Sequence, residues 1–486
     1  MAKDWTHPGI TPRTSGAWRR APSGFQVLAA TVLIGGYAFA AICWPETAFM
    51  AGLLIVQAAF VLSAVWKTVI AIASLRRPRP APVPIEWPRY TILVALHDEA
   101  AVAPDLIANL ARIDYPAHRL EAFIVLEAHD AATLAAVEAA PKPAWLKTCI
   151  VPPGHPLTKP RALNHALAQA RGDLVTIYDA EDRPHPQQLR RAAARFVAQP
   201  RLGCLQAPLR IRPSGRAGSA FLDRQFAFEY AALFEVTLPG MARLGLPFPL
   251  GGTSNHIRMT ALRAAGGWDA HNVTEDADLG FRLWSLGWTL DVIDCPTWET
   301  PPGGLDRWLP QRTRWLKGYM QTWGVHTRRP RRLGRRGLLS LVMTLGAAIL
   351  AAGAHAPTLA WLASAVLVGL HAGIAPATPL ASIAVLAAGV IAAWMGCAVG
   401  ARRAGLDYRL GDMLAAPAYW SLLSLAFVHA AWRLMVEPHV WDKTPHDSEL
   451  QPLELVESPT TLDARPPERL SARRWRPFFP RPPKLS

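Results

Sequence analysis

The stretch that decides the fold is LVTIYDAED at residues 174–182, where a β-rich apolar run leads directly into acidic residues. A short, continuous apolar run of this kind is typical of a strand buried on both faces of a sheet. In an extended chain the side chains of Asp179 and Glu181 emerge on the same side, so two carboxylates can face one ion. Such hard oxygen ligands suit Mg²⁺ or Mn²⁺. The alternative is a solvated acidic turn, but the position at the end of a buried strand favours the ion site.

Strand-like and helix-like patterns alternate around this stretch. We expect further strands at 90–96, 123–126 and 148–151, and helices at 105–112, 133–139 and 161–170. Such alternation predicts an α/β domain with a parallel sheet covered by helices on both faces. Ligands of these sheets bind outside the carboxyl ends of the strands, where the polar clusters of this chain fall. No GxGxxG or GxxxxGK[ST] loop follows any predicted strand, which disfavours a dinucleotide-binding fold and a P-loop ATPase.

The composition indicates membrane segments beside this domain. Hydrophobic residues make up 51% of the 486 residues and charged residues 18%, below the roughly 25% of soluble domains. The uncharged run 25–44 and the run 49–75 are each long enough to cross a bilayer, so they form a predicted helical hairpin. A cleaved signal peptide is the alternative for the first run, and the second span that follows at once disfavours it. Four more apolar runs lie at 338–354, 357–374, 379–400 and 413–436, which gives six expected spans.

These patterns divide the chain into five parts. We expect a cytoplasmic N-terminus at 1–24, a transmembrane hairpin at 25–80 and a catalytic α/β domain at 85–326, which includes an interfacial helix at 310–326. A second transmembrane block follows at 337–437, and a mostly disordered cytoplasmic tail at 438–486. The five cysteines lack a CxxC or paired spacing, which argues against a disulfide framework and a zinc site.

The charge of +15 is concentrated in arginine clusters beside the apolar runs. Clusters precede the first span, follow the second at 76–79 and precede the third at 328–336, so all three can lie in the cytoplasm. The expected location is therefore the inner membrane, with several spans and a cytoplasmic catalytic domain. A nucleic-acid surface is the alternative reading of 328–336, but its place beside a span favours contact with membrane lipid. Arg402, Arg403 and Arg409 disagree with six spans, because that count places their loop outside.

A second acidic cluster, Thr274-Glu275-Asp276, precedes a predicted helix at 279–286. A carboxylate here can take a proton from an acceptor hydroxyl, which makes Asp276 a candidate general base with Glu275 beside it. Thr274 can equally be no more than a helix cap.

The third cluster is QRTRW at residues 311–315, directly after Pro310. Gln311, Trp315, Tyr319 and Trp323 recur every four residues, which predicts one face of an amphipathic helix at the membrane surface. Arginine can bind a diphosphate with two parallel hydrogen bonds, and tryptophan offers an apolar face to a sugar ring. A plain interfacial anchor without catalytic residues is the alternative.

In this order the three clusters resemble the processive, membrane-embedded family 2 glycosyltransferases, the cellulose-synthase-like group. Thr274-Glu275-Asp276 and QRTRW match the TED and QxxRW motifs of that family in full. Asp179-Ala180-Glu181 stands where DxD is expected, and Glu127 replaces the Asp after the second strand. Further similar elements are Leu96-His97-Asp98-Glu99, the segment from Lys159 to Asn164, the loop 250–255, and WDKTPH at 441–446. The resemblance covers about residues 85 to 446.

The resemblance implies a GT-A fold that binds a UDP-sugar, most commonly UDP-glucose in this family and next most commonly UDP-GlcNAc. Glu99 and Glu127 would lie near the nucleotide. Lys159, Arg312 and Arg314 would bind the diphosphate, together with Mg²⁺ or Mn²⁺ on Asp179 and Glu181, and Asp182 could share the metal.

On the acceptor side, Asp276 would be the general base of an inverting transfer, which turns an α-linked donor into a β-linked product. Trp315 and Gln311 would support the acceptor glycan, with Ser254 and Asn255 in a loop beneath it. The expected product is a secreted polysaccharide, and accessory secretion proteins are possible partners; nucleic acid is not an expected partner.

Two other functions fit parts of the sequence. A non-processive enzyme would move one sugar to a polyprenyl or other lipid acceptor. A transporter would only bind nucleotide in its soluble domain, so Asp276→Asn would leave transport intact. No RxxxR followed by [DN]xSxxG is visible, so a PilZ domain that binds c-di-GMP is not expected.

Overall fold

The computed structural model describes residues 22–76, 81–212, 219–372, 377–438 and 440. The predicted N-terminus up to residue 21, the segment 441–446 and the rest of the predicted tail lie outside these residues.

A seven-stranded sheet carries the α/β domain, in the order β3-β2-β1-β4-β8-β6-β9. Its first four strands in chain order are the predicted ones and pair in parallel: β1 (Tyr90–Leu96), β2 (Leu120–Glu127), β3 (Leu146–Val151) and β4 (Leu174–Tyr178). The other half contains β6 (Leu202–Gln206), β8 (Asn255–Arg258) and β9 (Thr289–Val292). The α/β class is therefore confirmed.

The sheet is mixed rather than wholly parallel, because β8 runs antiparallel to both β4 and β6. The chain reaches β8 from the carboxyl edge of the sheet, where the backbone N–H of Ser254 donates to the carbonyl of Ile177 at 2.8 Å. A strand that starts at this edge can only run back against its neighbours. A small second sheet follows the order β5-β10-β7, formed by β5 (Arg183–Pro184), β10 (Thr297–Glu299) and β7 (Leu209–Ile211).

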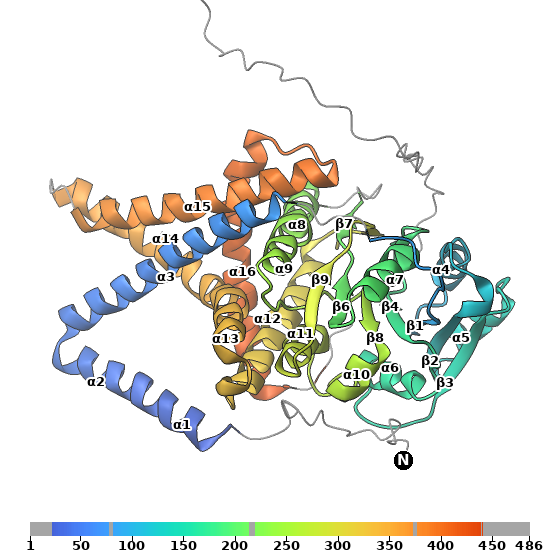
Figure 1. Ribbon diagram of the computed structural model, residues 1–486. Coiled ribbons are helices and arrows are strands. Elements are labelled where there is room, and N and C mark those ends of the chain that lie inside the picture. The colour runs from blue at the N-terminus through green and yellow to red at the C-terminus, as the bar shows by residue number, and fades with distance from the viewer. Residues whose placement is uncertain (1–21, 77–80, 213–218, 373–376, 439, 441–486) are drawn as a thin grey trace, which may run out of the picture. The chain divides into compact units, whose positions relative to one another are not determined.

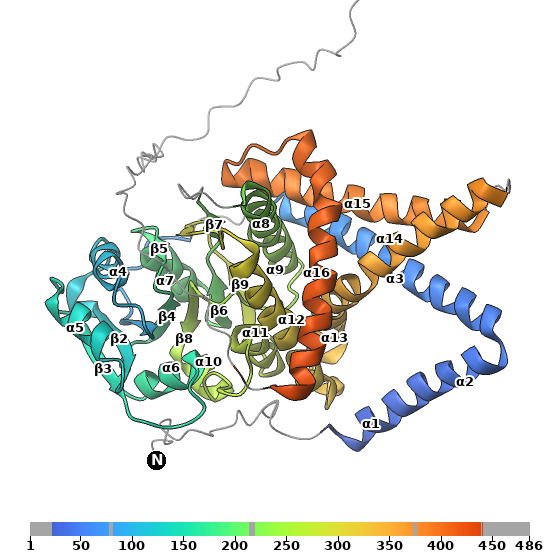
Figure 2. The same ribbon diagram turned by 180° about the vertical axis from the view of Figure 1, so that it is seen from behind.

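Helices cover both faces of the large sheet because successive side chains of a strand point to opposite faces. Ile92 and Val94 of β1 pack in one core with α4 (Ala103–Leu110), α5 (Ala131–Ala139) and α7 (Gln188–Ala198). Leu93, between them, packs in the other core with α6 (Lys159–Leu167), α8 (Ala220–Ala232), α9 (Leu238–Arg243), α10 (Met259–Ala265) and α11 (Glu275–Ser285). Figures 1 and 2 show these two layers.

Five helical segments of the described chain are long and apolar enough to cross a membrane. The first is Gly24–Cys43, made of α1 (Gly24–Ala30), the π-helical turn η1 (Thr31–Gly35) and α2 (Gly36–Cys43). The second is α3 (Pro45–Ser74), and the third is Gly334–His371, which contains α13 (Gly334–Leu341), η5 (Val342–Gly346) and most of α14 (Ala347–Ala372). The last two are α15 (Ala377–Ala404) and α16 (Leu410–Val436).

The expectation of six spans was wrong at Pro357. We predicted that this proline separates two spans, but α14 continues through it. Neighbouring helices can satisfy the backbone groups around a proline within a bundle. Here Ser424 of α16 accepts a hydrogen bond from the backbone N–H of Ala356 at 3.2 Å, directly before the proline.

The predicted interfacial helix is α12 (Leu305–Thr327), and it begins five residues earlier than expected. Pro310 lies inside the helix instead of in its first turn. Trp308, completely buried in the core of the domain, anchors the additional turn.

Candidate active site

The predicted site residues surround a cavity of about 380 Å³ at the carboxyl edge of the sheet. Ten of the fourteen residues singled out from the sequence line it: Glu99, Glu127, Lys159, Asp179, Glu181, Glu275, Asp276, Gln311, Arg314 and Trp315. The other four, Asp182, Ser254, Asn255 and Arg312, are not among its lining residues. The cavity therefore brings together side chains from six elements that are far apart in the sequence.

The side of the cavity formed by β1 and β2 carries Glu99 and Glu127. Both residues are buried, and Glu127 ends β2. Arg161 donates two hydrogen bonds from one nitrogen to the Glu127 carboxylate, at 2.9 and 3.1 Å. The backbone N–H of Glu99 donates to Thr133 at 2.9 Å. The first pair of contacts fixes the Glu127 carboxylate, and the second contact holds the backbone of Glu99.

Lys159 lines the part of the cavity that also contains Asp179 and Glu181, which we call its acidic side. Its ammonium group forms an ion pair with Asp179 and donates to the carbonyl of Gly252 at 2.9 Å. Burial disfavours the charged lysine, but attraction by Asp179 and Glu275 outweighs it, so the pKa of Lys159 is raised above its ordinary value. The lysine therefore remains cationic and places a positive charge at the DxD position.

Asp182 has a different role from the predicted metal ligand. It is almost completely buried, and it accepts hydrogen bonds from the backbone N–H of Asp179, at 2.8 Å, and from the hydroxyl of Thr253. Burial and the neighbouring Asp179 raise its pKa well above the ordinary value. Asp182 thus holds the turn that presents Asp179 and Glu181.

Glu275 and Asp276 lie in the first turn of α11 and line the same cavity. Burial raises the pKa of Asp276 to about 6, although Lys159 and Arg314 lower it. Burial and the charge of Asp276 raise the pKa of Glu275 to about 8. A Cβ added to Gly252 would lie 3.5 Å from the Asp276 carboxylate, so the glycine loop faces this group closely. A carboxylate with a pKa near neutrality is suited to accept a proton.

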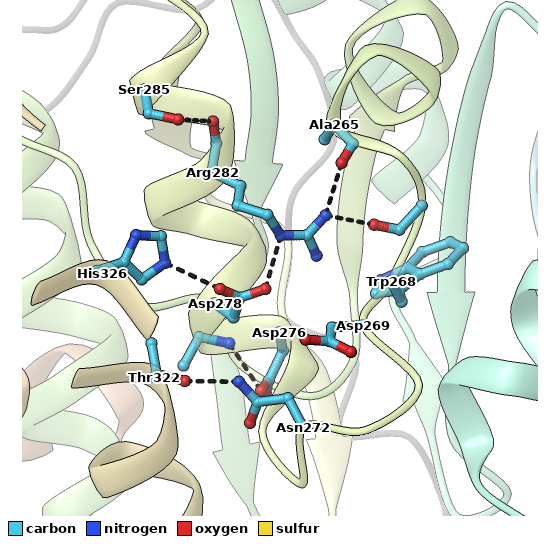
Figure 3. A network of polar contacts seen from close by, with 12 residues as sticks. Ala265, Trp268, Asp269, Asn272, Asp276, Asp278, Arg282, Ser285, Thr322 and His326 are labelled. Atoms are coloured by element: carbon cyan, nitrogen blue, oxygen red, sulfur yellow. Dashed lines mark hydrogen bonds and ion pairs between the residues drawn. The ribbon is translucent and has the colours of Figure 1, made fainter. Parts of the chain in front are cut away.

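A buried network holds this turn against α12 (Figure 3). The carboxylate of Asp278 pairs with Arg282 at 2.6 Å and with His326 of α12 at 2.9 Å. Arg282 also donates to the carbonyls of Ala265 and Gly267, at 2.9 and 2.6 Å, and Asn272 donates to Thr322 of α12 at 3.0 Å. The acidic turn is therefore fixed to the helix that carries QRTRW.

One face of α12 lines the cavity with Gln311, Arg314, Trp315 and Tyr319. Arg312 points elsewhere: it donates to Glu229 of α8 at 2.8 Å and to Tyr419 of α16 at 2.9 Å. Its guanidinium also lies over the ring of Trp315, 4.4 Å from the ring centroid. Arg312 follows Gln311 by one residue and is thus about 100° away from it around the helix. Of the two arginines predicted to bind diphosphate, only Arg314 faces the cavity.

The loop before β8 faces the cavity with Gly251, Gly252 and Thr253 rather than with Ser254 and Asn255. Ser254 shares a 2.6 Å hydrogen bond with Thr297, and Asn255 donates to the carbonyl of Gly251 at 2.6 Å. The two predicted acceptor residues therefore form hydrogen bonds that hold the loop, and they do not line the cavity.

Glu299 is a cavity residue that sequence reasoning missed. It ends β10 and is buried, and burial together with Asp182 and Glu181 raises its pKa well above the ordinary value. Its signal in the sequence was weak: an acidic residue directly after Thr297-Trp298, with Pro-Pro-Gly-Gly following at 301–304.

The donor set of the acidic side fits a hard divalent cation, because Asp179, Glu181 and Glu299 all offer carboxylate oxygens to the cavity. A separate group of close ligand atoms, within the described part of the chain, comprises His97, Asp98 and Asp130 at the ends of β1 and β2. His97 and Asp98 are exposed, and Asp130 caps α5 by accepting from the backbone N–H of Thr133 at 3.1 Å. The second group thus has a structural explanation in the helix cap.

Comparison with known proteins gives matches to two family models. The model for glycosyl transferase family group 2 matches residues 174–432, and the model for glycosyl transferase family 2 matches residues 91–234. Among solved structures, a mannosyltransferase from Pyrobaculum calidifontis, in complex with GDP-Man and Mn²⁺, is similar with a TM-score of 0.53 and 19% identity. The match covers 79% of this chain and 98% of that one, which supports the GT-A fold.

Three curated relatives are similar at low identity. The probable glycosyltransferase YdaM of Bacillus subtilis is 27% identical over 48% of this chain and 56% of its own length. A β-monoglucosyldiacylglycerol synthase of Synechocystis is 28% identical over 49% of this chain and 50% of its own, and cellulose synthase 1 of Komagataeibacter xylinus is 25% identical over 51% and 16%. The chain thus spans about half the length of the first two relatives.

Proposed function

Since the chain belongs to glycosyl transferase family group 2, we propose that it transfers a sugar from a UDP-sugar, preferably UDP-glucose, to an acceptor hydroxyl with inversion. The observation that carries this proposal is one cavity with two unlike acidic sides. Asp179 is paired with Lys159, whereas Asp276 is desolvated and has a pKa of about 6.

On the donor side, Glu99 and Glu127 would lie near the nucleotide, and Lys159 and Arg314 would bind the diphosphate. Asp179 and Glu181, with Glu299 beside them, would hold Mg²⁺ or Mn²⁺, which neutralises diphosphate charge when bound. The fold neighbour from Pyrobaculum, in complex with GDP-Man and Mn²⁺, supports the use of a divalent cation.

On the acceptor side, Asp276 would accept the proton of the acceptor hydroxyl as its oxygen attacks the anomeric carbon. The bond from that carbon to the diphosphate breaks, and its electron pair leaves with the diphosphate oxygen. The cationic groups of Lys159 and Arg314 would lie where this charge develops, which is where fixed charges accelerate a reaction most. Attack from the face opposite to the leaving group gives a β-linkage from an α-linked donor.

We further propose that the acceptor is the end of a growing β-linked glycan, which is secreted across the inner membrane from a cytoplasmic catalytic domain. The match of QRTRW and the helices beside the domain support this cellulose-synthase-like reading. Trp315 and Gln311 would contact the acceptor sugar where α12 borders the cavity.

A lipid acceptor is the second candidate function. Leu233, Phe234 and Leu250 line the same cavity, and apolar side chains suit a lipid chain or a polyprenyl group. The similarity to β-monoglucosyldiacylglycerol synthases supports this candidate as well.

The test is a screen of UDP-sugars with the purified protein in detergent, read as UDP release, followed by analysis of the labelled product in membranes. We expect UDP release with one donor and loss of it in Asp276→Asn, with unchanged release in Asp105→Asn, an exposed matched control. Product insoluble in organic solvent supports a glycan, whereas product extracted wholly as lipid replaces the first acceptor by the second. Absence of UDP release with every donor would contradict the proposed function.

A further inference from the structure

The last helix, α16, has the length and apolarity of a membrane span, yet its start is bound to the catalytic domain. The carboxylate of Asp412 pairs with Arg224 of α8 through two hydrogen bonds, at 2.7 and 2.6 Å. The carbonyl of Asp412 accepts from Gln225 of the same helix at 2.8 Å. The N-terminal end of α16 therefore lies against α8.

The other end of α16 is bound to the same domain. Lys317 of α12 donates to the carbonyls of Glu437 and Val440, at 3.3 and 2.8 Å, and Gln321 donates to the carbonyl of Pro438 at 2.7 Å. Lys317 and Gln321 are completely buried under this contact. Both ends of the helix thus touch the domain that carries the cavity.

The middle of α16 follows α12 between these points. The hydroxyl of Tyr419 accepts from Trp308 at 3.1 Å and from Arg312 at 2.9 Å, and it donates to Glu229 at 2.7 Å. Ten residues further along α16, His429 shares a hydrogen bond with Thr313 at 3.1 Å. A helix of 27 residues is about 40 Å long, so a span of this length would carry one end far away from the domain.

The helices α3 and α15 reach the catalytic domain with one end only. Arg403, near the end of α15, donates to the carbonyl of Ser74 at the end of α3, at 3.0 Å, and to the carbonyl of Glu235 in the domain. Their other halves extend away from the domain, and Gln57 of α3 meets Ser382 of α15 there. Figures 1 and 2 show α3, α14 and α15 running outward, whereas α16 crosses their direction.

The outer face of α16 is apolar and exposed within the described part of the chain. Leu414, Leu425, Val428, Trp432 and Met435 follow helical spacing and are each at least half exposed. On another face, Phe427 of α16 packs against α14, where a Cβ added to Gly353 would lie 3.1 Å from its ring. Arginine and tryptophan at such a helix are typical of the membrane interface, and Arg402, Arg409 and Arg433 flank or belong to α16.

We propose that α16 lies in the membrane surface on the side of the catalytic domain, with its outer face among the lipids, and that the described part of the chain crosses the membrane four times. The four crossings are Gly24–Cys43, α3, Gly334–His371 and α15. Because Gly334–His371 is one crossing rather than two, the loop with Arg402, Arg403 and Arg409 lies on the same side as the arginine clusters at 76 and 328–336, whether or not α16 itself crosses. This proposal does not depend on the identity of donor or acceptor.

The first test places single cysteines on both sides of α16, in protein whose Cys43 and Cys397 are replaced by Ala; the remaining cysteines are buried. The sites are Asp407→Cys before α16, Val440→Cys after it, and Lys142→Cys on the catalytic domain. His371→Cys marks the far side, and so does the natural Cys43 in a separate variant in which Cys397 alone is replaced by Ala. An impermeant maleimide is applied to intact cells and to inverted membrane vesicles, and thermal unfolding checks that each variant is folded.

We expect residues 142, 407 and 440 to react in the same preparation, and residues 43 and 371 to react in the other one. Reaction of residues 407 and 440 from opposite sides would show that α16 crosses the membrane and overturn the proposal.

The second test measures depth with fluorophores on cysteines at Leu414, Val428 and Met435, quenched by lipids brominated at shallow or deep acyl positions. We expect equal, shallow quenching along α16, and graded quenching at Ile383, Ile391 and Arg402 of α15, which serves as the control. Graded quenching along α16 contradicts the surface position, and absence of quenching shows that the outer face does not contact lipid; either result overturns the proposal.

Discussion

The two acidic sides of the cavity consist of the same chemical groups in opposite surroundings. Asp179 at the end of β4 is paired with Lys159, whereas Asp276 in the first turn of α11 is desolvated, which raises its pKa to about 6. A neighbouring lysine offsets the charge of a carboxylate, whereas desolvation raises the affinity of a carboxylate for a proton. The surroundings, rather than the residue type, thus divide the work between the two sides.

The strongest test of this difference is Asp276→Asn. Because the amide cannot accept a proton, we expect the transfer rate to fall by about 10²- to 10⁴-fold, the usual contribution of a general base. Binding of the donor should persist, since Asp179 and Lys159 are untouched. The measurements are UDP release for the rate and calorimetric titration with UDP for binding, with Asp105→Asn as the control. Equal rates in the two variants would remove Asp276 from the proposed mechanism.

The matching change on the other side is Asp179→Asn. It removes one carboxylate from the donor set and leaves Lys159 without this partner, so we expect a loss in metal affinity or activity of at least the about 10- to 100-fold that removal of an outer-shell partner causes. The loss should appear as a higher Mn²⁺ concentration for half-maximal UDP release, a readout that Asp276→Asn leaves unchanged. If both variants show the same dependence on Mn²⁺, the two sides do not differ in the way proposed here.

Most of the donor side was predictable, because its residues follow local patterns. Asp179, Glu181 and Glu127 end or follow apolar runs that the periodicity identifies as strands, and the parallel order of these strands brings their ends to one edge. The roles of Asp182 and Arg312 were not predictable in this way. Asp182 turns inward because it caps the turn and meets Thr253, 71 residues later. Arg312 turns away because Glu229 and Tyr419, 83 and 107 residues distant, bind it. Pairings over such distances leave no trace in a local pattern.

The prediction of six spans was wrong for a related reason. Length and apolarity are properties of a single segment, whereas the place of α16 depends on its partners Arg224, Lys317 and Arg312. Similarly, whether Pro357 breaks a helix depends on a neighbour that satisfies the backbone beside it.

The pH dependence of the transfer rate below pH 7 is a further test of the difference between Asp179 and Asp276. A general base acts only when it has lost its proton, so the rate should rise about tenfold per pH unit below pH 6 and level off above it. Arg314 lowers the pKa of Asp276 through its charge, so Arg314→Gln should move this rise to higher pH. The measurement is UDP release at saturating donor between pH 4.5 and 8.5. A rise that stays at the same pH in Arg314→Gln would show that Asp276 does not set it.

The smallest expected effect is on stability, and the two sides should differ in its sign. The pKa of Asp276 is raised from 3.8 to about 6 in the folded protein, so the protonated form folds more favourably. Above pH 6 the folded state bears an ionised, desolvated carboxylate that costs roughly 1–3 kcal/mol, and this cost disappears below the unfolded pKa near 4. Asp276→Asn should therefore raise the thermal unfolding temperature at pH 8 and change it little at pH 4.5.

Asp179→Asn should lower the unfolding temperature at pH 8 instead, because it removes the attraction to Lys159, a partly exposed pair that contributes about 1 kcal/mol or less. Thermal unfolding of both variants in detergent, with Asp105→Asn as the control, measures whether the unfolding temperature rises or falls in each. A fall in both variants would mean that Asp276 is stabilised in its ionised form by its neighbours. Its cavity would then hold a second anchored anion rather than a base, and the chemical difference between the two sides would be lost.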